Sequence, residues 1–153
     1  MEYVDKLMNN TTYLEVVKQI EEYEKKRKFC RHGLEHYLSV ARIAYIMNLE
    51  QELHQDKEFI YLCALLHDIG RVYEYENGQP HELGGVVLAK KFLEEIDYPQ
   101  EKRAEILKGI GEHRKEEDTL FWFADKRARN CFLCEAAADC NWKDEKRTKT
   151  IEW

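Results

Sequence analysis

Apolar residues recur along most of this chain at the three- and four-residue intervals of amphipathic helices. Leu14, Val17 and Ile20 share one helical face, and Val40 and Met47 share another further along. No segment alternates apolar and polar residues for long enough to predict a β-strand, and no repeat or linker is evident. The pattern therefore predicts an all-α bundle of about six helices, with approximate bounds 12–27, 36–50, 57–70, 81–96, 99–113 and 119–134.

Local capping signals set the expected helix ends. Thr12 and Glu15 have the spacing of a capping box. Asp56 and Thr119 each precede a helical pattern as N-cap residues. Gly70 stands where a helix ends or loosens, which places the residues just before it at a helix terminus.

Length and composition indicate one compact domain over residues 1–153. The chain is 44% hydrophobic and contains only 7 Gly and 2 Pro, which suits a packed core. The longest apolar stretch, residues 59–66, is too short to cross a bilayer. The first ten residues lack the basic and apolar regions of a secretory signal. We therefore expect a cytoplasmic protein with no membrane partner.

Charge narrows the class of partner. The chain has 30 acidic and 24 basic residues, a formal net charge of −6. Binding to a phosphate backbone needs a basic surface, so duplex nucleic acid is not an expected partner. A small anionic substrate held by a few local Arg or Lys residues stays compatible with this charge.

Several residues of metal-ligand type share helical faces with apolar residues and therefore point to the interior. Any one buried histidine is explained as well by a hydrogen bond in the core. The whole set is harder to explain in that way, because burying two carboxylates without nearby positive charge is costly, and a divalent ion supplies that charge. The set consists of His36, His67, His81, His113 and Asp125, with Asp68 adjacent to His67.

Three motifs in this order resemble the HD-domain metal-dependent phosphohydrolases. They are a histidine early on a helix (His36 in EHYLSVARIA), the HD doublet (His67 and Asp68 in LLHDIGR) and a late aspartate (Asp125 in FADKRARN). The resemblance covers about residues 30–130 and leaves a cysteine-containing extension over 131–153. It implies an HD-type helical bundle with His36, His67, Asp68 and Asp125 as ligands of a first metal.

The same resemblance implies a binuclear centre. His81 and His113 look like the additional histidines of members with two metals, and Asp68 would then bridge the ions and take part in catalysis. The cofactor expected is one or two divalent ions among Fe, Mn, Co, Ni, Mg and Zn. Such ions activate water to hydroxide and stabilise the charge that develops on phosphate oxygens.

The substrate is less well defined. No GYP triplet follows the HD motif and His113 is not paired with a second histidine, which argues against the cyclic-di-GMP phosphodiesterases. Alarmone hydrolases carry an acidic pair soon after the HD motif, whereas this chain has Val72 and Tyr73 near that position. The difference argues against that class of enzyme as well. We expect a small phosphorylated substrate, a nucleotide in the first instance, cleaved at a phosphomonoester or phosphoanhydride.

Basic and imidazole side chains near the motifs are candidates for binding that substrate. Arg71 lies one turn beyond Asp68, where a guanidinium can contact a phosphate, although an Arg on a solvated face explains it equally well. His32 is expected either to line the substrate pocket or to contact a metal ligand without binding the metal itself. A helix-capping role is a further alternative. Arg31 is a further candidate, and weaker ones of the same kind are Arg114, Lys126 and Arg127.

Four cysteines form a second group. Cys131, Cys134 and Cys140 are close in sequence, and Cys30 precedes His36 by the same six residues that separate Asp125 from Cys131. If His36 and Asp125 meet on antiparallel helices, Cys30 and Cys131 each lie about 9 Å from that point along the helix axis, in the same direction. The two cysteines would then be close together. A structural zinc ion or an iron–sulfur cluster is one interpretation, and buried free thiols are the other. Cys63 is expected in the core.

Three functions thus remain open on the sequence. The first is a divalent-metal phosphohydrolase. The second is a non-catalytic module in which the metal site serves as a ligand sensor or a structural staple. The third is an interaction protein with an aromatic-rich acidic surface and no metal. A second copy of the chain, as a homodimer, is a further candidate partner.

Overall fold

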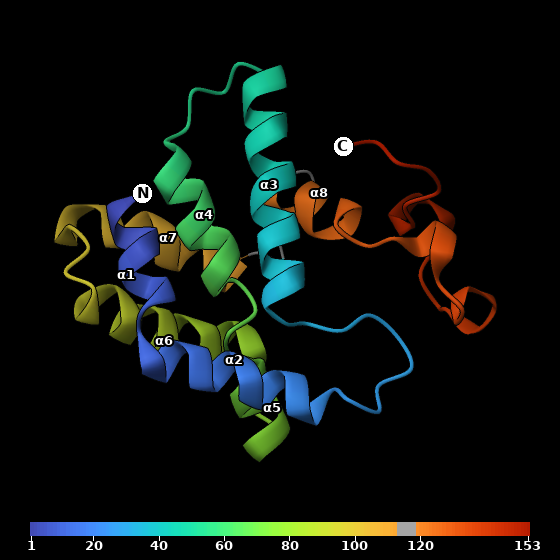
Figure 1. Ribbon diagram of the computed structural model, residues 1–153, viewed down its shortest axis with the longest axis horizontal. Coiled ribbons are helices and arrows are strands. Elements are labelled where there is room, and N and C mark those ends of the chain that lie inside the picture. The colour runs from blue at the N-terminus through green and yellow to red at the C-terminus, as the bar shows by residue number, and fades with distance from the viewer. Residues whose placement is uncertain (113–118) are drawn as a thin grey trace.

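The computed structural model describes residues 1–112 and 119–153, which form helices and no β-strands (Figure 1). The all-α prediction is confirmed, but these residues contain eight α-helices rather than about six. The α-helices are α1 (Glu2–Met8), α2 (Thr11–Tyr23), α3 (Leu34–Glu50), α4 (Lys57–Leu66), α5 (Arg71–Asn77), α6 (His81–Glu95), α7 (Gln100–Glu112) and α8 (Leu120–Arg127).

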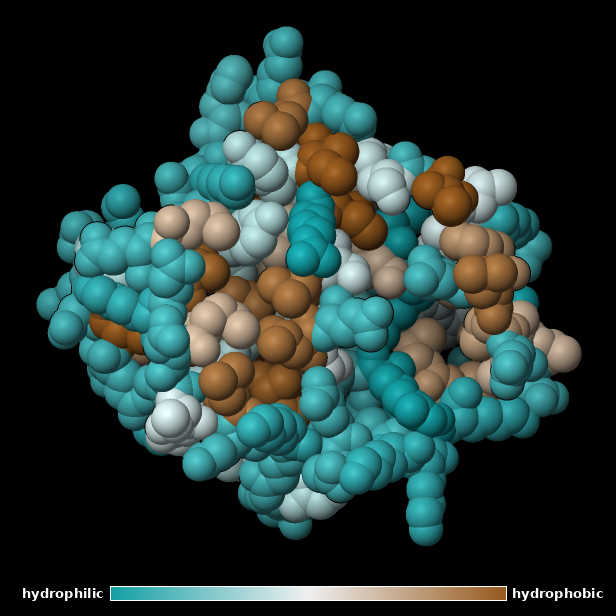
Figure 2. All heavy atoms as spheres, viewed as in Figure 1, coloured by the Kyte–Doolittle hydropathy of each residue, from teal (hydrophilic) through white to brown (hydrophobic). Residues whose placement is uncertain are grey.

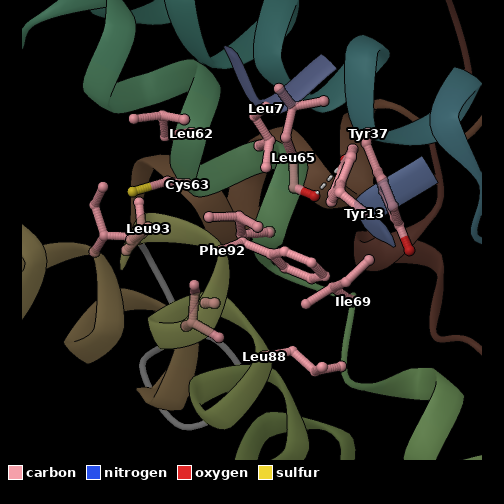
Figure 3. Packing of buried hydrophobic residues seen from close by; sticks show 14 of the residues in the cluster. Leu7, Tyr13, Tyr37, Leu62, Cys63, Leu65, Ile69, Leu88, Phe92 and Leu93 are labelled. Atoms are coloured by element: carbon pink, nitrogen blue, oxygen red, sulfur yellow. Dashed lines mark hydrogen bonds between the residues drawn. The ribbon is translucent and has the colours of Figure 1, made fainter. Parts of the chain in front are cut away.

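Two groups of buried side chains hold the helices together. In the larger group, drawn in part in Figure 3, the Tyr13 hydroxyl donates a 2.9 Å hydrogen bond to the Leu65 carbonyl oxygen. The smaller group joins α3, α4 and α8 through residues such as Val40, Ile60 and Ala124. Helix α4 contributes to both groups, so its C-terminal end is fixed from two sides.

Hydrogen bonds at the helix starts confirm two of the predicted caps and correct a third. The side chains of Asp56 and Thr119 accept hydrogen bonds from backbone amides at the starts of α4 and α8. Helix α2 is capped instead by Asn10, whose side chain accepts from the Tyr13 amide at 2.9 Å. The capping box expected at residues 12–15 was therefore wrong, because the N-cap is Asn10, two residues before Thr12.

Two helix ends also differ from the prediction. Helix α4 stops at Leu66, and the rest of the expected helix is a turn followed by α5. Helix α8 stops at Arg127 rather than near residue 134. It is followed by three short 3-10 helices, η1 (Cys131–Leu133), η2 (Ala137–Asp139) and η3 (Asp144–Lys146). The expected loop at residues 114–118 falls outside the described residues.

The surface is mostly hydrophilic, with apolar side chains gathered near the middle of one face and along α3 (Figure 2). On α3 the exposed apolar residues are Ile46 and Leu49. In the part of the chain that the structure describes, no helix combines the length and apolar character needed to span a bilayer.

Candidate metal centre

His67 and Asp68 lie just beyond the end of α4, in the turn that leads to α5. On a helix their side chains would diverge by about 100°. Because the turn ends the helix, His67 Nε2 lies 3.2 Å from Asp68 Oδ2. Gly70 allows the turn to press against α6, since an added Cβ would lie 2.0 Å from the His81 carbonyl oxygen. The expected convergence at a helix end is thus observed, and the role of Gly70 is close packing.

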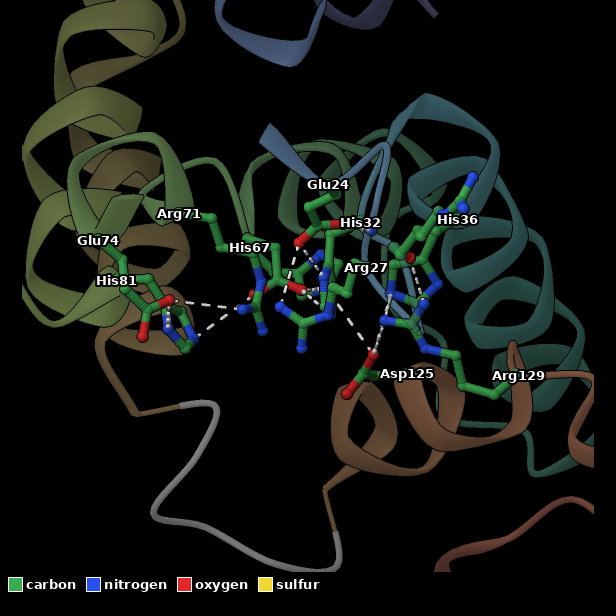
Figure 4. A network of polar contacts seen from close by, with 12 residues as sticks. Glu24, Arg27, His32, His36, His67, Arg71, Glu74, His81, Asp125 and Arg129 are labelled. Atoms are coloured by element: carbon green, nitrogen blue, oxygen red, sulfur yellow. Dashed lines mark hydrogen bonds and ion pairs between the residues drawn. The ribbon is translucent and has the colours of Figure 1, made fainter. Parts of the chain in front are cut away.

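Two further helices bring His36 and Asp125 to the same place (Figure 4). His36 is in the first turn of α3, and its Nε2 lies 3.1 Å from Asp125 Oδ1 on α8. Asp125 Oδ1 is also 4.0 Å from His67 Nε2. One ligand atom from each of His36, His67, Asp68 and Asp125 lies within 4.8 Å of the others. These are the four residues that the resemblance assigned to a first metal.

Hydrogen bonds fix the orientation of two of the imidazoles. His67 Nδ1 lies 2.7 Å from the Ala64 carbonyl oxygen and donates to it. His81 Nδ1 lies 3.1 Å from Glu74 Oε2, while its Nε2 is 3.5 Å from Asp68 Oδ1. A histidine that binds a metal through Nε2 commonly donates from Nδ1 to a carbonyl or carboxylate in this way. Both rings therefore present Nε2 to Asp68 as metal-binding histidines do.

Three of the four groups have protonation states that suit a cation. Burial lowers the pKa of His67, but contact with Asp68 and Asp125 raises it above its ordinary value. Burial raises the pKa of Asp68, but the Arg71 guanidinium and His67 lower it more, and the net pKa is well below the ordinary range. Burial also raises the pKa of Asp125, but contact with His36 together with the charges of Lys126 and His67 brings it well below its ordinary range. Burial lowers the pKa of His36 to about 4, so its imidazole is neutral at pH 7. Two carboxylates and a neutral imidazole are suitable ligands for a divalent ion.

The contact between His36 and Asp125 gives a direct test of whether a metal fits. Arg129 Nη2 lies 2.8 Å from His36 Nε2 and donates to it, so the imidazole proton is on Nδ1. No proton then separates His36 Nε2 from Asp125 Oδ1, although both atoms are acceptors only 3.1 Å apart. Asp125 Oδ1 is also buried and accepts no hydrogen bond of good geometry from the residues that the structure describes. A metal ion that took the place of Arg129 at the single lone pair of His36 Nε2, and that Asp125 also bound, would resolve this, so the residues fit the ion.

Comparison with known proteins agrees with this arrangement. Residues 33–149, more than half of the chain, match the HD domain family. The chain belongs to the HD domain family. An uncharacterized protein of Clostridium beijerinckii is 42% identical over 149 residues, which is 95% of each chain. The crystal structure of a predicted HD superfamily hydrolase from an uncultured Thermotogales bacterium has a TM-score of 0.65 and 22% sequence identity, over 89% of this chain and 79% of that one. This likeness shows the fold.

More distant relatives are larger proteins named ribonuclease Y. The protein from Oleidesulfovibrio alaskensis is 32% identical over 54% of this chain and 16% of its own length. Ribonuclease Y 1 of Pediococcus pentosaceus is 34% identical over 52% of this chain and 15% of its own length. This chain thus spans less than a fifth of those two relatives, and each match covers only about half of this chain.

We call the group of four candidate ligands the HD centre; its members are His36, His67, Asp68 and Asp125. The remaining predicted site residues differ in how close they lie to it. Arg71 Nε lies 3.0 Å from Asp68 Oδ1, and the residue is buried, so it is not on a solvated face. His32 Nε2 is 3.9 Å from Asp68 Oδ2. Arg31 is exposed and turns back to donate a hydrogen bond to the Lys25 carbonyl oxygen. His113 and Arg114 lie outside the described residues.

Glu24, which the sequence analysis did not single out, holds His32 in place. Its Oε1 is 2.8 Å from His32 Nδ1 and accepts a 2.5 Å hydrogen bond from the Tyr75 hydroxyl. Burial alone would raise the pKa of this carboxyl, but the hydrogen bonds from His32 and Tyr75 lower it to about 2. Nothing in the local sequence pattern reveals this role, because Glu24 lies just after the end of α2 in a run of charged residues.

This depressed pKa predicts a pH-dependent contribution to stability. The contribution is complete above the pKa of about 4.3 in the unfolded chain and is lost as the pH falls through about 2. In metal-free protein we expect Glu24→Gln to lower the free energy of unfolding at pH 7 by about 2–3 kcal/mol. The difference from wild type should shrink between pH 5 and pH 2. Urea unfolding at several pH values measures it, and a difference that stays constant across this range would contradict the assignment.

Arg129 is a second residue that the sequence analysis missed. Besides its contact with His36, it places Nη2 3.8 Å from Asp125 Oδ1. It follows Asp125 by four residues, a spacing that on a continued helix would place both on one face. That spacing was the available signal. Helix α8 ends at Arg127, yet Arg129 is still buried and reaches the centre.

A pocket of about 580 Å³ opens beside the HD centre. Its C-terminal wall comes from residues 141–146, which follow the last cysteine. Cationic side chains outnumber acidic ones in its lining, in contrast to the net charge of −6 of the whole chain. The cationic residues are Arg71, Lys126, Arg129, Lys143 and Lys146, and the acidic ones are Asp68, Asp125 and Glu145.

The cysteines lie outside the helices on which their expected meeting depended. Cys30 precedes the start of α3, and Cys131 follows the end of α8. The argument from equal translations along two helices was therefore wrong in its geometry, because neither six-residue offset runs along a helix. The four cysteines are free thiols of intermediate burial, and Cys63 is buried in the core as expected.

Proposed function

We propose that the protein is a metal-dependent phosphohydrolase that cleaves a phosphomonoester or phosphoanhydride of a small nucleotide. The observation that carries this proposal is the convergence of four buried ligand atoms within 4.8 Å of one another at the edge of a cationic pocket. A divalent ion, when bound, stabilises negative charge on phosphate oxygens and lowers the pKa of a water molecule.

The roles of the protein's own side chains follow from their positions. His36, His67, Asp68 and Asp125 would hold the ion. Arg71 is fixed by its contact with Asp68 Oδ1 and lines the pocket, where its guanidinium would orient a phosphate through paired hydrogen bonds. Since Arg71 is buried and held in place, it would lose little conformational entropy on binding.

Aromatic and cationic side chains elsewhere in the pocket lining support a nucleotide. Lys126 Nζ lies 5.7 Å from the ring centroid of Trp122 and 5.4 Å from that of Trp142, and all three residues line the pocket. Indole rings offer flat apolar faces on which a nucleobase stacks, and a lysine beside them attracts phosphate. The pocket therefore combines surfaces for both parts of such a substrate.

Asp68 is the residue on which a second ion would depend. Its Oδ2 faces His67, whereas its Oδ1 faces His81 at 3.5 Å and Arg71 at 3.0 Å. We propose that the group of four would hold one ion, and that Asp68 and His81 would hold a second where it binds. Arg71 supplies positive charge on that side in the single-ion state, and His113 lies outside the described residues.

Removal of the metal is expected to abolish activity. The test is a set of chromogenic and nucleotide phosphomonoesters, phosphoanhydrides and a phosphodiester, assayed with Mn, Co, Fe, Ni, Mg or Zn. A short RNA belongs in the set because the partial relatives are named ribonuclease Y. Chelation should lower the rate to background, and adding back one metal should restore it. A rate that survives chelation, with no metal left by elemental analysis, would contradict the mechanism.

One observation favours a second candidate, a non-catalytic HD module. Cationic side chains already neutralise both buried aspartates, since Lys126 Nζ lies 2.5 Å from Asp125 Oδ2 and Arg71 Nε lies 3.0 Å from Asp68 Oδ1. A sensor or interaction protein would keep this arrangement without turnover. Protein that binds metal but hydrolyses no member of the set would support the sensor, and protein that binds no metal would support the interaction module.

A further inference from the structure

The C-terminal segment, residues 131–153, has almost no core of its own. Its regular structure is limited to three 3-10 helices, and only Ala136 and Thr148 in it are buried. A segment that buries so little apolar surface gains little from the hydrophobic effect to offset the entropy lost on ordering. Nevertheless it forms one wall of the pocket beside the HD centre, through residues such as Trp142 and Lys146.

The polar contacts that hold this segment are mostly at the surface. The Lys28–Asp139 ion pair, 2.7 Å long, joins side chains that are 60% and 63% exposed. Arg127 and Glu152 form another pair at 2.9 Å. Exposed ion pairs typically contribute about 0–1 kcal/mol each. These contacts alone therefore hold the segment to the rest of the protein only weakly.

The loop between α2 and α3 is the part of the chain that lies against the C-terminal segment (Figure 1). The Lys28–Asp139 pair brings this loop against the segment, and Arg129 donates a hydrogen bond to the Arg31 carbonyl oxygen. Cys30 lies between these two points of contact.

The two contacts between the loop and the segment place Cys30 in the same region as two cysteines that are distant in sequence, Cys131 and Cys134. Burial raises the pKa of the Cys30 thiol and the Arg129 charge lowers it. The thiolate charges of Cys131 and Cys134 raise it further. About 100 residues separate Cys30 from these two cysteines in the sequence, so it is the fold that brings the three into one region.

Tight turns present the C-terminal cysteines in a chelating arrangement. The Cys134 amide donates to the Cys131 carbonyl oxygen at 3.2 Å, closing a turn around the two intervening residues. The Cys140 amide donates in the same way to the Ala137 carbonyl oxygen at 3.3 Å. Two cysteines separated by two residues in such a turn are a common pair of ligands for thiolate-bound metals.

We propose that Cys30, Cys131, Cys134 and Cys140 bind a thiolate-ligated metal centre that fastens the C-terminal segment to the loop between α2 and α3. The centre is a zinc ion or an iron–sulfur cluster, because both take four cysteine thiolates. It would link parts of the chain that otherwise share few buried contacts, and it would hold the wall of the pocket in place. This proposal does not depend on the proposed hydrolase function.

The spacing of the sulfur atoms bears on which metal binds. A zinc ion with Zn–S bonds of about 2.3 Å holds its sulfurs about 3.8 Å apart. Among the described residues, the HD centre is the one group with three or more ligand atoms within 4.8 Å of one another, so the cysteine sulfurs are spread more widely. A single zinc ion therefore requires the loop and the segment to close around it. An iron–sulfur cluster, being larger, requires less movement.

The test is metal analysis of the full chain purified without oxygen. Four proteins are compared: wild type, Cys131→Ser/Cys134→Ser, the buried control Cys63→Ala, and Asp68→Ala. We expect the double variant to lose the thiolate-bound metal and keep the HD metal, while Asp68→Ala shows the reverse. Cys63→Ala should keep both. Zinc would leave the protein colourless, whereas a cluster would give visible absorption and acid-labile sulfide.

X-ray absorption spectra of wild-type protein keep the proposal testable if the double variant fails to fold. Sulfur ligands at about 2.3 Å from Zn or Fe would support it. Wild-type protein in which these four thiols react freely with a thiol reagent, and which holds no metal with sulfur ligands, would overturn it. A disulfide among the four would overturn it as well. Either outcome leaves the HD metal and the hydrolase proposal unaffected, because those rest on Asp68→Ala and on the substrate assays.

Discussion

Replacing Asp68 with alanine is expected to remove the HD metal and to lower kcat/KM by more than about 100-fold, since loss of a residue that only orients a metal ligand already costs about 10–100-fold. Among the described residues, Asp68 is the one whose carboxylate oxygens face both His67, at 3.2 Å, and His81, at 3.5 Å. Its removal therefore takes a ligand from either proposed ion. Elemental analysis after metal loading, together with the phosphatase assay, measures both effects.

Controls separate the loss of a ligand from the loss of the fold. Asp68→Ala also removes the carboxylate that contacts buried Arg71, which by itself costs stability. Asp68→Asn keeps the shape and the hydrogen-bonding capacity but not the charge, so it should fold and still bind metal weakly. Asp5→Ala, at an exposed position in α1, should change neither property. Full metal occupancy in folded Asp68→Ala would show that the ion binds elsewhere.

The positions of the metal-site residues were predictable because long helices carry a clear periodicity. His36 lies in the same register as Val40 and Met47 on α3, and all three are buried. That register alone indicates that His36 points into the interior of the bundle. The convergence of His67 with Asp68 needed one further signal, a nearby helix end. Gly70 supplied that signal, although for a different physical reason from the one expected.

The residues around these ligands were not predictable in the same way. Glu24 and Arg129 lie just beyond the ends of α2 and α8, where periodicity stops and side-chain direction depends on the local turn. The contact of each residue is with a partner on another element, His32 for Glu24 and His36 for Arg129. Such pairings are tertiary, and the mark they leave in the sequence is limited to the four-residue spacing between Asp125 and Arg129. The predicted helix that corresponds to α8 was too long for a related reason. The 3-10 turns that follow α8 have no amphipathic period that would distinguish them from a continued helix.

Gly70→Ala is expected to lower the free energy of unfolding by at least about 3 kcal/mol, at the upper end of the cost of overpacking a core. The new Cβ would lie 2.0 Å from the His81 carbonyl oxygen and 2.1 Å from the Gly85 backbone nitrogen. Both neighbours are backbone atoms of α6, which cannot rotate away as a flexible side chain would. Relief of the clash requires α6 to move from the turn, and His81 would move with it away from Asp68.

The matched control is Gly109→Ala, because no atom lies within 4 Å of a Cβ added at that position in α7. A glycine in a helix costs about 1 kcal/mol relative to alanine, so this substitution should stabilise the protein by up to that amount. Urea unfolding of metal-free protein measures both variants on the same scale. If Gly70→Ala lowers the free energy of unfolding and Gly109→Ala raises it, the loss of stability in Gly70→Ala comes from the contact with α6. A Gly70→Ala protein as stable as wild type would mean that the turn at Gly70 and α6 do not approach as closely as described.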